Sequence, residues 1–195
     1  MFGPLQVTTF IRDMLRDLFL EYGDEDFVWS PDVRLSKITI GTINDINSEE
    51  RKQQFPRILV QRGPTFLQTQ FIGGNFARTN GGTVGISTGD VETYRQDITG
   101  SLTILIETRQ EGTCESLAEY VRKFICWSRK YIESQFGFNR FGNQMQISQC
   151  DMDLEDTERF KISINIPYII EEKWETSGNL TRLNHVFHKL KDTTS

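Results

Sequence analysis

Two short motifs in the chain combine carboxylates and a lysine as metal-dependent nucleases do. Pro31-Asp32 and Glu171-Glu172-Lys173 match the general form of a Pro-Asp followed later by a Glu-x-Lys. The motifs are far apart in the sequence and Asp32 falls in a predicted loop, so chance readily produces such a match. A metal-dependent nuclease or other hydrolase that uses Asp32 and Glu171 is therefore an alternative and not the main prediction.

An acidic run in the last third of the chain has the spacing of a calcium-binding loop but lacks two required residues. Asp156 replaces the turn glycine, and Ile162 occupies the twelfth position, where a bidentate glutamate is needed. We interpret the run as a solvated tip between two strands. Its members are Asp151, Asp153, Glu155, Asp156 and Glu158.

The remaining candidates for chemistry are incomplete. His185 and His188 could reach one metal from a helix, but no nearby carboxylate or thiol completes the shell. The glycine-rich segment from Gly73 to Asp90 has no lysine and therefore cannot form a phosphate loop. No serine or cysteine has a sequence-adjacent base. We predict a protein without catalytic residues, bound metal or cofactor.

The composition is that of an ordinary globular protein, with 37% apolar and 25% charged residues among 195. No apolar run is long enough to cross a bilayer, and the charges from Arg12 to Asp17 interrupt the stretch that a signal peptide would need. We therefore expect a cytosolic protein without membrane contact. A net charge of −5 disfavours general binding of nucleic acid.

The cysteines do not form a recognisable disulfide or zinc pattern. Cys114, Cys126 and Cys150 are an odd number and include no C-x-x-C pair. We expect reduced thiols that mostly serve in packing.

Apolar residues at helical spacing predict three helices. The first ends before Gly23, the second runs from a cap at Thr113 to Gln135 with Gly137 after it, and the third spans Leu180 to Leu190. The apolar stripe of the first helix consists of Val7, Phe10, Ile11, Met14, Leu15, Leu18 and Phe19.

Alternating apolar residues predict several strands of an antiparallel sheet. Pro167 lies in the last strand and cannot donate a hydrogen bond, which indicates an edge position or a bulge. Sheet and helices together predict an α+β fold in one domain, residues 1–195, with an N-terminal helix and loop at 1–35. The expected strands are 37–43, 56–61, 91–107, 145–149 and 160–170.

The glycine-rich segment precedes a long extended stretch that exceeds what a core needs. Val91 to Glu107 is far longer than a typical strand of about 5 to 6 residues. We predict that Thr65–Ile72 and Val91–Asp97 pair as a projecting β-hairpin arm, residues 64–97, whose glycine-rich tip contacts another subunit. The candidate contact residues in the tip are Gly73, Gly74, Arg78, Gly81, Gly82 and Gly85.

The long second helix carries an aromatic stripe beside its core stripe. Tyr120, Phe124, Trp127 and Tyr131 widen its apolar arc to about 180°, against roughly 100° for a helix that packs on one surface. Two interpretations stay open. The stripe packs under the first or last helix of the same subunit, or it packs against another subunit.

Three segments together resemble the tail-terminator or neck proteins of tailed bacteriophages. The resemblance covers about Ser36 to Trp174 in element order, and the chain differs from compact members in its long first helix and larger glycine-rich excursion. It implies an α+β subunit of a hexameric ring that caps the tail tube and joins the tail to the head connector. The segments are Phe55–Gly63, Asp97–Ile106 and Cys114–Ile125.

The resemblance also implies partners and a location. The partners are further copies of the chain, the tail tube protein and the head-tail connector or stopper protein, with DNA only passing through the ring lumen. The location is the virion neck, and the host cytoplasm during assembly. We expect ring contacts through the arm, the aromatic stripe and the Pro167 strand. A non-catalytic adaptor that binds one protein partner is a further alternative.

Overall fold

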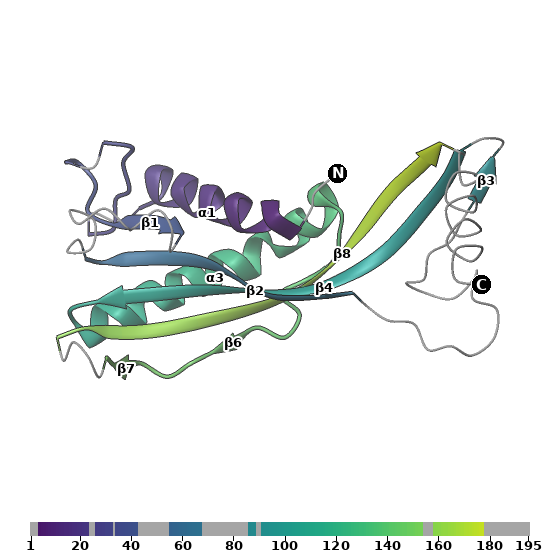
Figure 1. Ribbon diagram of the computed structural model, residues 1–195. Helices are drawn as coiled ribbons and strands as arrows, with labels where there is room; N and C mark the ends of the chain where they lie inside the picture. The colour runs from purple at the N-terminus through teal and green to yellow at the C-terminus, as the bar shows by residue number, and fades with distance from the viewer. Residues whose placement is uncertain are drawn as a thin grey trace, which may run out of the picture. The chain divides into compact units, whose positions relative to one another are not determined.

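The structure is a computed structural model that describes residues 4–23, 26–32, 34–42, 55–67, 86–88, 91–153 and 158–177 of the 195-residue chain. The predicted helix Leu180–Leu190 and residues 68–85 lie outside these ranges. Figure 1 shows the elements, which are α1 (Pro4–Glu21), β1 (Thr39–Thr42), β2 (Arg57–Leu67), β3 (Ile86–Thr88), β4 (Val91–Thr108), α3 (Glu111–Phe136), β5 (Phe138–Phe141), β6 (Gln146–Ile147), β7 (Asp151–Met152) and β8 (Phe160–Ser177).

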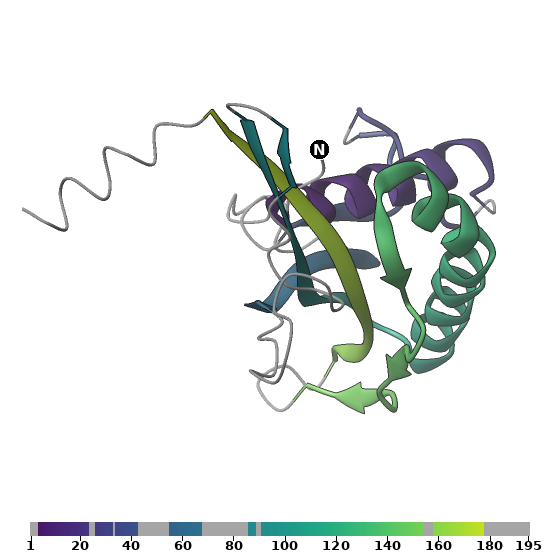
Figure 2. The same ribbon diagram turned by 90° about the vertical axis from the view of Figure 1, so that its right-hand side faces the viewer.

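The described strands form one mixed sheet, and the two described helices cover one of its faces (Figure 2). The strand order is β1-β2-β4-β8-β5, with β3 added on β4 and with β6 and β7 added on β8. The α+β class is therefore confirmed. The sheet is not antiparallel throughout, because β1 pairs with β2 in parallel, Thr39 opposite Arg57. The long connection between these strands leaves room for the crossover that a parallel pair requires.

The contacts divide the chain into two compact units. The core unit contains Phe2–Phe66 and Ile98–Ile170, and the second unit contains Leu67–Asp97 and Glu171–Ser195. The second unit thus takes in most of the predicted arm. Strands β2, β4 and β8 contribute residues to both units.

The core lies between the helices and the alternate residues of β4 and β8 that face them. From Ile98 to Thr108 of β4 and from Ile162 to Ile170 of β8, residues at even positions are buried. Their odd-numbered neighbours remain partly exposed, apart from the buried Glu107. Helix α1 buries its apolar stripe in this core, and α3 buries the core stripe that lies beside its aromatic stripe. The buried set includes Val7, Ile11, Leu15 and Phe19 of α1, Leu102, Ile104 and Ile106 of β4, Leu117, Val121, Ile125 and Ile132 of α3, and Ile162, Ile164, Ile166, Tyr168 and Ile170 of β8.

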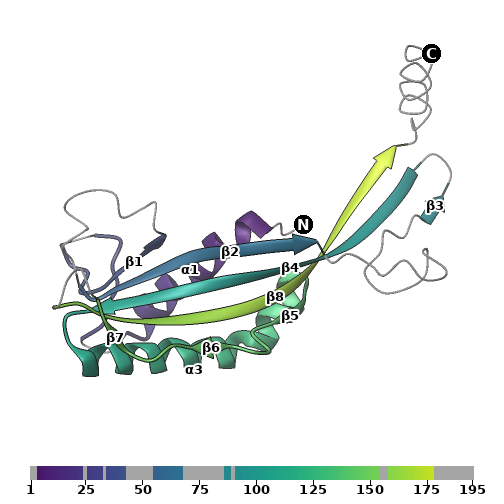
Figure 3. The same cartoon turned by 60° about the horizontal axis from the view of Figure 1, so that its bottom comes forward.

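Helices α1 and α3 run antiparallel beside each other (Figure 3). The start of α1 contacts the end of α3, where the rings of Phe10 and Phe136 have centroids 4.0 Å apart. The end of α1 contacts the start of α3, where the centroids of Phe19 and Tyr120 are 5.4 Å apart. Aromatic contacts therefore join the two helices at both ends.

The start of α3 differs from the prediction, and its end agrees with it. Gln110 is the N-cap residue and makes no side-chain cap bond, so the predicted cap at Thr113 is wrong. The hydroxyl of Thr113 instead donates to the Gln110 side chain at 3.2 Å, one turn inside the helix. Gly137 ends the helix in the left-handed conformation, with φ 71°, which a glycine adopts without a Cβ clash.

The glycine-rich segment is not a loop over its whole length. Its residues Ile86–Thr88 form β3, which pairs antiparallel with the start of β4, Thr88 opposite Val91. The start of β4 therefore pairs with a neighbour in sequence on one side. Most of its predicted partner, Thr65–Ile72, lies outside the described residues.

Pro167 does not lie at an open edge, because β8 has β4 on one side and β5, β6 and β7 on the other. The ladder is interrupted opposite this proline. Strand β5 pairs as far as Tyr168, and β6 begins its pairing at Asn165. The carbonyl of Pro167 accepts a hydrogen bond from the Gly142 amide at 2.8 Å. Because the missing donor falls between two short strands, the interior of the sheet tolerates the proline.

Gly100 of β4 lies directly against the buried ring of Tyr168, and this contact gives a test of the core. A Cβ atom at Gly100 would lie 2.4 Å from Cζ of Tyr168. We expect Gly100→Ala to lower the free energy of unfolding by about 1 to 3 kcal/mol through overpacking, measured by urea denaturation.

Gly112 is the matched control, because a Cβ atom there would meet nothing within 4 Å. Gly112→Ala lies in the first turn of α3 and is expected to leave stability unchanged or raise it by up to about 1 kcal/mol. Equal losses in the two variants would contradict the packing of Tyr168 on β4.

Candidate interaction surface

The structure divides the predicted aromatic stripe of α3 into two halves. Tyr120 and Phe124 are partly buried and pack against the core. The hydroxyl of Tyr120 donates to the main-chain oxygen of Tyr22 at 2.7 Å, just past the end of α1. For Tyr120, burial against the first helix of the same subunit is confirmed.

The other half of the stripe remains on the surface. The side chain of Trp127 is 83% exposed and that of Tyr131 is 58% exposed. The ring of Tyr131 contacts Phe136 edge-on, with centroids 6.1 Å apart. These two large aromatic side chains are therefore exposed where a binding partner can bury them.

Helical spacing sets two lysines beside these aromatic side chains. Lys123, Trp127, Lys130 and Tyr131 are all exposed and lie at i, i+4, i+7 and i+8 on α3. We call these four residues the α3 ridge. The ridge alternates positive charge with aromatic surface along the helix.

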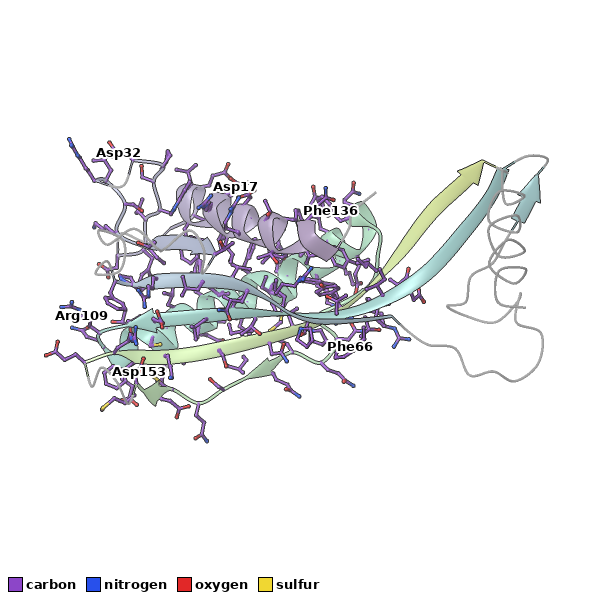
Figure 4. All side chains as sticks on the ribbon, viewed as in Figure 1. Asp17, Asp32, Phe66, Arg109, Phe136 and Asp153 are labelled. Carbon is purple, nitrogen blue, oxygen red and sulfur yellow. The ribbon has the colours of Figure 1, made fainter. Side chains whose placement is uncertain are left out.

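The end of α1 carries a second exposed surface, of the opposite charge. Leu20 is 51% exposed and Tyr22 is 70% exposed, and the carboxylates of Asp17 and Glu21 are exposed beside them. We call these four residues the α1 ridge. Figure 4 shows Asp17 on the side of α1 that points away from the sheet.

Some of the charged side chains of α3 form ion pairs with one another. Glu119 accepts two hydrogen bonds of 2.6 Å from Arg122 and lies 3.4 Å from the amine of Lys123. The Arg122 guanidinium beside it lowers the pKa of Glu119 to about 2, so this carboxylate stays ionised at neutral pH. Lys130 has no ion pair within the described part of the chain. It is therefore the ridge lysine most available to an outside carboxylate.

The other predicted contact residues do not gather at this surface. Pro167 lies inside the sheet, in β8. The glycine-rich tip falls within residues 68–85, outside the described ranges. Its contact residues are Gly73, Gly74, Arg78, Gly81, Gly82 and Gly85.

The residues of the alternative hydrolase prediction belong to different parts of the chain. The carboxylate of Asp32 accepts a hydrogen bond of 3.0 Å from the main-chain amide of Arg34 and so closes a local turn. Glu171 belongs to the second unit, and His185 and His188 lie beyond the described residues. Among the described residues, no group of three His, Cys, Asp or Glu side chains could hold a metal.

A charged network on the other face of the sheet is a feature that sequence reasoning missed. Arg57 of β2 forms an ion pair with Glu107 of β4, and both side chains are buried. Arg159, just before β8, lies 3.9 Å from Glu107 and forms an ion pair with Asp153. Lys161 adds a 3.9 Å contact to Asp153. Charges of alternating sign thus cross four neighbouring strand segments.

The network contradicts part of one prediction made from the sequence. Asp153 is buried and ion-paired, so the prediction of a solvated acidic tip is wrong at this position. The guanidinium groups of Arg57 and Arg109 lie 4.7 Å and 5.5 Å from the ring of Phe55, which covers the end of the network. Arg57 and Glu107 are 50 residues apart, and no local pattern links residues at that separation.

The three cysteines have different surroundings. Cys114 is buried at the start of α3, where its thiol lies 3.7 Å from the carbonyl oxygens of Ile106 and Phe160. Burial raises the pKa of the Cys114 thiol to about 12, and burial likewise raises the pKa of Cys150. Cys126 is exposed on α3, so the expected packing role does not hold for this residue.

Comparison with protein-family models and with curated proteins finds no match for this chain. In the described part of the chain, no helix is both long enough and apolar enough to span a membrane.

The charged network predicts that replacing a buried carboxylate lowers the free energy of unfolding far more than replacing an exposed one. Glu107→Gln would remove the buried carboxylate that pairs with Arg57 and lies 3.9 Å from Arg159. We expect a loss of about 3 to 5 kcal/mol in the free energy of unfolding, measured by urea denaturation. Glu119→Gln, which removes an exposed ion pair on α3, should change stability far less. Similar effects of the two substitutions would argue against a buried network.

The thiol environments predict an order of alkylation. At pH 8, iodoacetamide should modify the exposed Cys126 first and Cys114 last, because a buried thiol with a raised pKa is both covered and protonated. Peptide mass spectrometry after timed labelling measures this order, and labelling in urea should abolish it. Native Cys114 that reacts as fast as Cys126 would contradict the packing at the start of α3.

The same pKa shift gives a sign for the pH dependence of stability. The Cys114 pKa rises from its ordinary value of 9.0 to about 12 on folding. Between these values the unfolded chain loses the proton and the folded chain keeps it. The contribution of Cys114 therefore lowers stability as the pH rises above about 9.

Proposed function

We propose that this chain is a non-catalytic structural subunit of a tailed-phage virion, either the tail terminator or another neck component. Copies of the chain form a ring, expected to be hexameric, that caps the tail tube and joins the tail to the head connector. DNA passes through the lumen of the ring and is not chemically changed. The ring acts in the virion neck and assembles in the host cytoplasm without a cofactor.

The observation that carries this proposal is the exposure of Trp127 beside Tyr131 on a helix whose other side is already buried. An aromatic pair of this size on the surface marks a contact site, because aromatic side chains are enriched at the cores of protein interfaces. The segment from Cys114 to Ile125, which carries part of the resemblance to neck proteins, lies in the same helix, α3.

The extended strands add support for assembly through subunit contacts. Strands β4 and β8 have 18 residues each, against about 5 to 6 for a typical strand. The described β5 pairs with β8 only up to Ile170, so the remainder of β8 extends past this neighbour. A backbone edge of this kind can pair with a neighbouring chain. The tail tube protein and the connector protein are the expected partners on the two sides of the ring.

Native mass spectrometry of the purified chain, alone and with the tail tube protein, tests the proposal. We expect a closed oligomer, of six subunits if the resemblance holds. Trp127→Ser with Tyr131→Ser should weaken the subunit contact by at least about 2 kcal/mol, because buried aromatic anchors dominate interfaces. That loss corresponds to more than about tenfold in the dissociation constant.

Leu35→Ser is the matched control, because Leu35 is 70% exposed and lies in the loop after α1 instead of on α3. This variant should assemble as the unmodified chain does, and circular dichroism should show both variants folded. A chain that stays monomeric with and without the tube protein would exclude the ring function.

A further inference from the structure

The α3 ridge has the chemistry of a surface that binds an acidic and apolar partner. Lys123 and Lys130 lie on either side of Trp127, one helical turn or nearly so from it, and Tyr131 extends the aromatic surface by a further turn. A partner that buries the indole must therefore also meet two ammonium groups. Carboxylates beside apolar side chains satisfy both requirements.

The α1 ridge has this complementary chemistry. Asp17 and Glu21 are one turn apart on α1, and Leu20 and Tyr22 are exposed next to them. Neither carboxylate forms an ion pair with another described residue of the chain. Each ridge therefore presents two charges and two large apolar side chains, with the signs of charge reversed.

The two ridges do not satisfy each other within one molecule. The lysines of the α3 ridge make no ion pair with Asp17 or Glu21 in the part of the chain that the structure describes. The two described helices cover the same face of the sheet (Figure 2). A second copy of the chain can bring its own α1 ridge to the free α3 ridge.

We infer that the α3 ridge of one copy packs against the α1 ridge of the next copy. Trp127 and Tyr131 bury their rings against Leu20 and Tyr22, and the lysines pair with Asp17 and Glu21. Because the two surfaces differ, a row of joined copies keeps one unpaired ridge at each of its two ends. Such a head-to-tail contact closes into a ring when its rotation permits. This inference rests on the proposed function and names the contact that builds the ring.

Nucleic acid is the less suitable occupant of the α3 ridge. The chain has a net charge of −5, and Glu115, Glu119 and Glu133 lie on the same helix. These carboxylates offset the basic side chains of α3 and so weaken its attraction for phosphate, whereas a protein surface with a few placed carboxylates meets the lysines locally. A second copy is therefore favoured over a nucleic acid.

Charge reversal tests the contact directly. Variant A carries Lys123→Glu and Lys130→Glu, and variant B carries Asp17→Lys and Glu21→Lys. Each variant alone places like charges across the contact, so its self-association should weaken by at least about tenfold. All four residues are exposed, so each variant should keep the thermal stability of the unmodified chain.

An equimolar mixture of the two variants is the decisive measurement. In the mixture, the unchanged acidic ridge of A meets the unchanged lysines of B, and the reversed ridges also match. Native mass spectrometry should therefore show assembly restored, with A and B in equal numbers. The control is a double variant, Asp151→Lys with Glu158→Lys, at exposed residues in β7 and before β8. It makes the same change in net charge as variant B and should leave assembly intact.

Several outcomes would overturn the inferred contact. Assembly of A and B like the unmodified chain places the subunit contact elsewhere and leaves the ring function standing. A mixture that stays monomeric, or an unmodified chain that stays monomeric in the absence of tube protein, removes the contact. The ring function is then judged separately from the mass of the complex with the tube protein. Monomers that bind a DNA oligonucleotide through Lys123 and Lys130 would assign the ridge to nucleic acid.

Discussion

Burial of one face of the sheet under two antiparallel helices is the constraint on which the rest of the core unit depends. Alternate residues of β4 and β8 face α1 and α3, so the registers of both strands and the rotations of both helices are set together. Gly100 exists beside Tyr168 because the ring needs the space that a Cβ atom would fill. A slip of one residue in either strand would expose the isoleucines and bury polar side chains.

The same packing decides which aromatic side chains of α3 remain available. The end of α1 reaches Tyr120 through the ring of Phe19 and the main-chain oxygen of Tyr22. Trp127 and Tyr131 are further along α3 and stay exposed. Core packing thus takes the first half of an aromatic stripe and leaves the second half at the surface, where the proposed subunit contact would use it.

The opposite face of the sheet is organised by charge. Arg57, Glu107, Arg159 and Asp153 lie on adjacent strand segments, so each carboxylate has a cation on either side or close by. Removing charges from water is costly, and this cost is offset only when every partner is in position. The network therefore favours one specific order of β2, β4, β8 and β7 over alternatives with the same hydrophobic pattern.

The sequence by itself determined the α+β class, the two described helices, the long strands and the apolar stripes, because periodicities of 3.6 and 2 residues are local properties of the chain. It also identified Gly137 as the end of α3. It did not determine the parallel pairing of β1 with β2, the interior position of Pro167 or the burial of Asp153, since each depends on segments that are distant in sequence. The division of the aromatic stripe was likewise decided by the tertiary structure, because exposure of a helical residue depends on which distant segments of the chain lie against it.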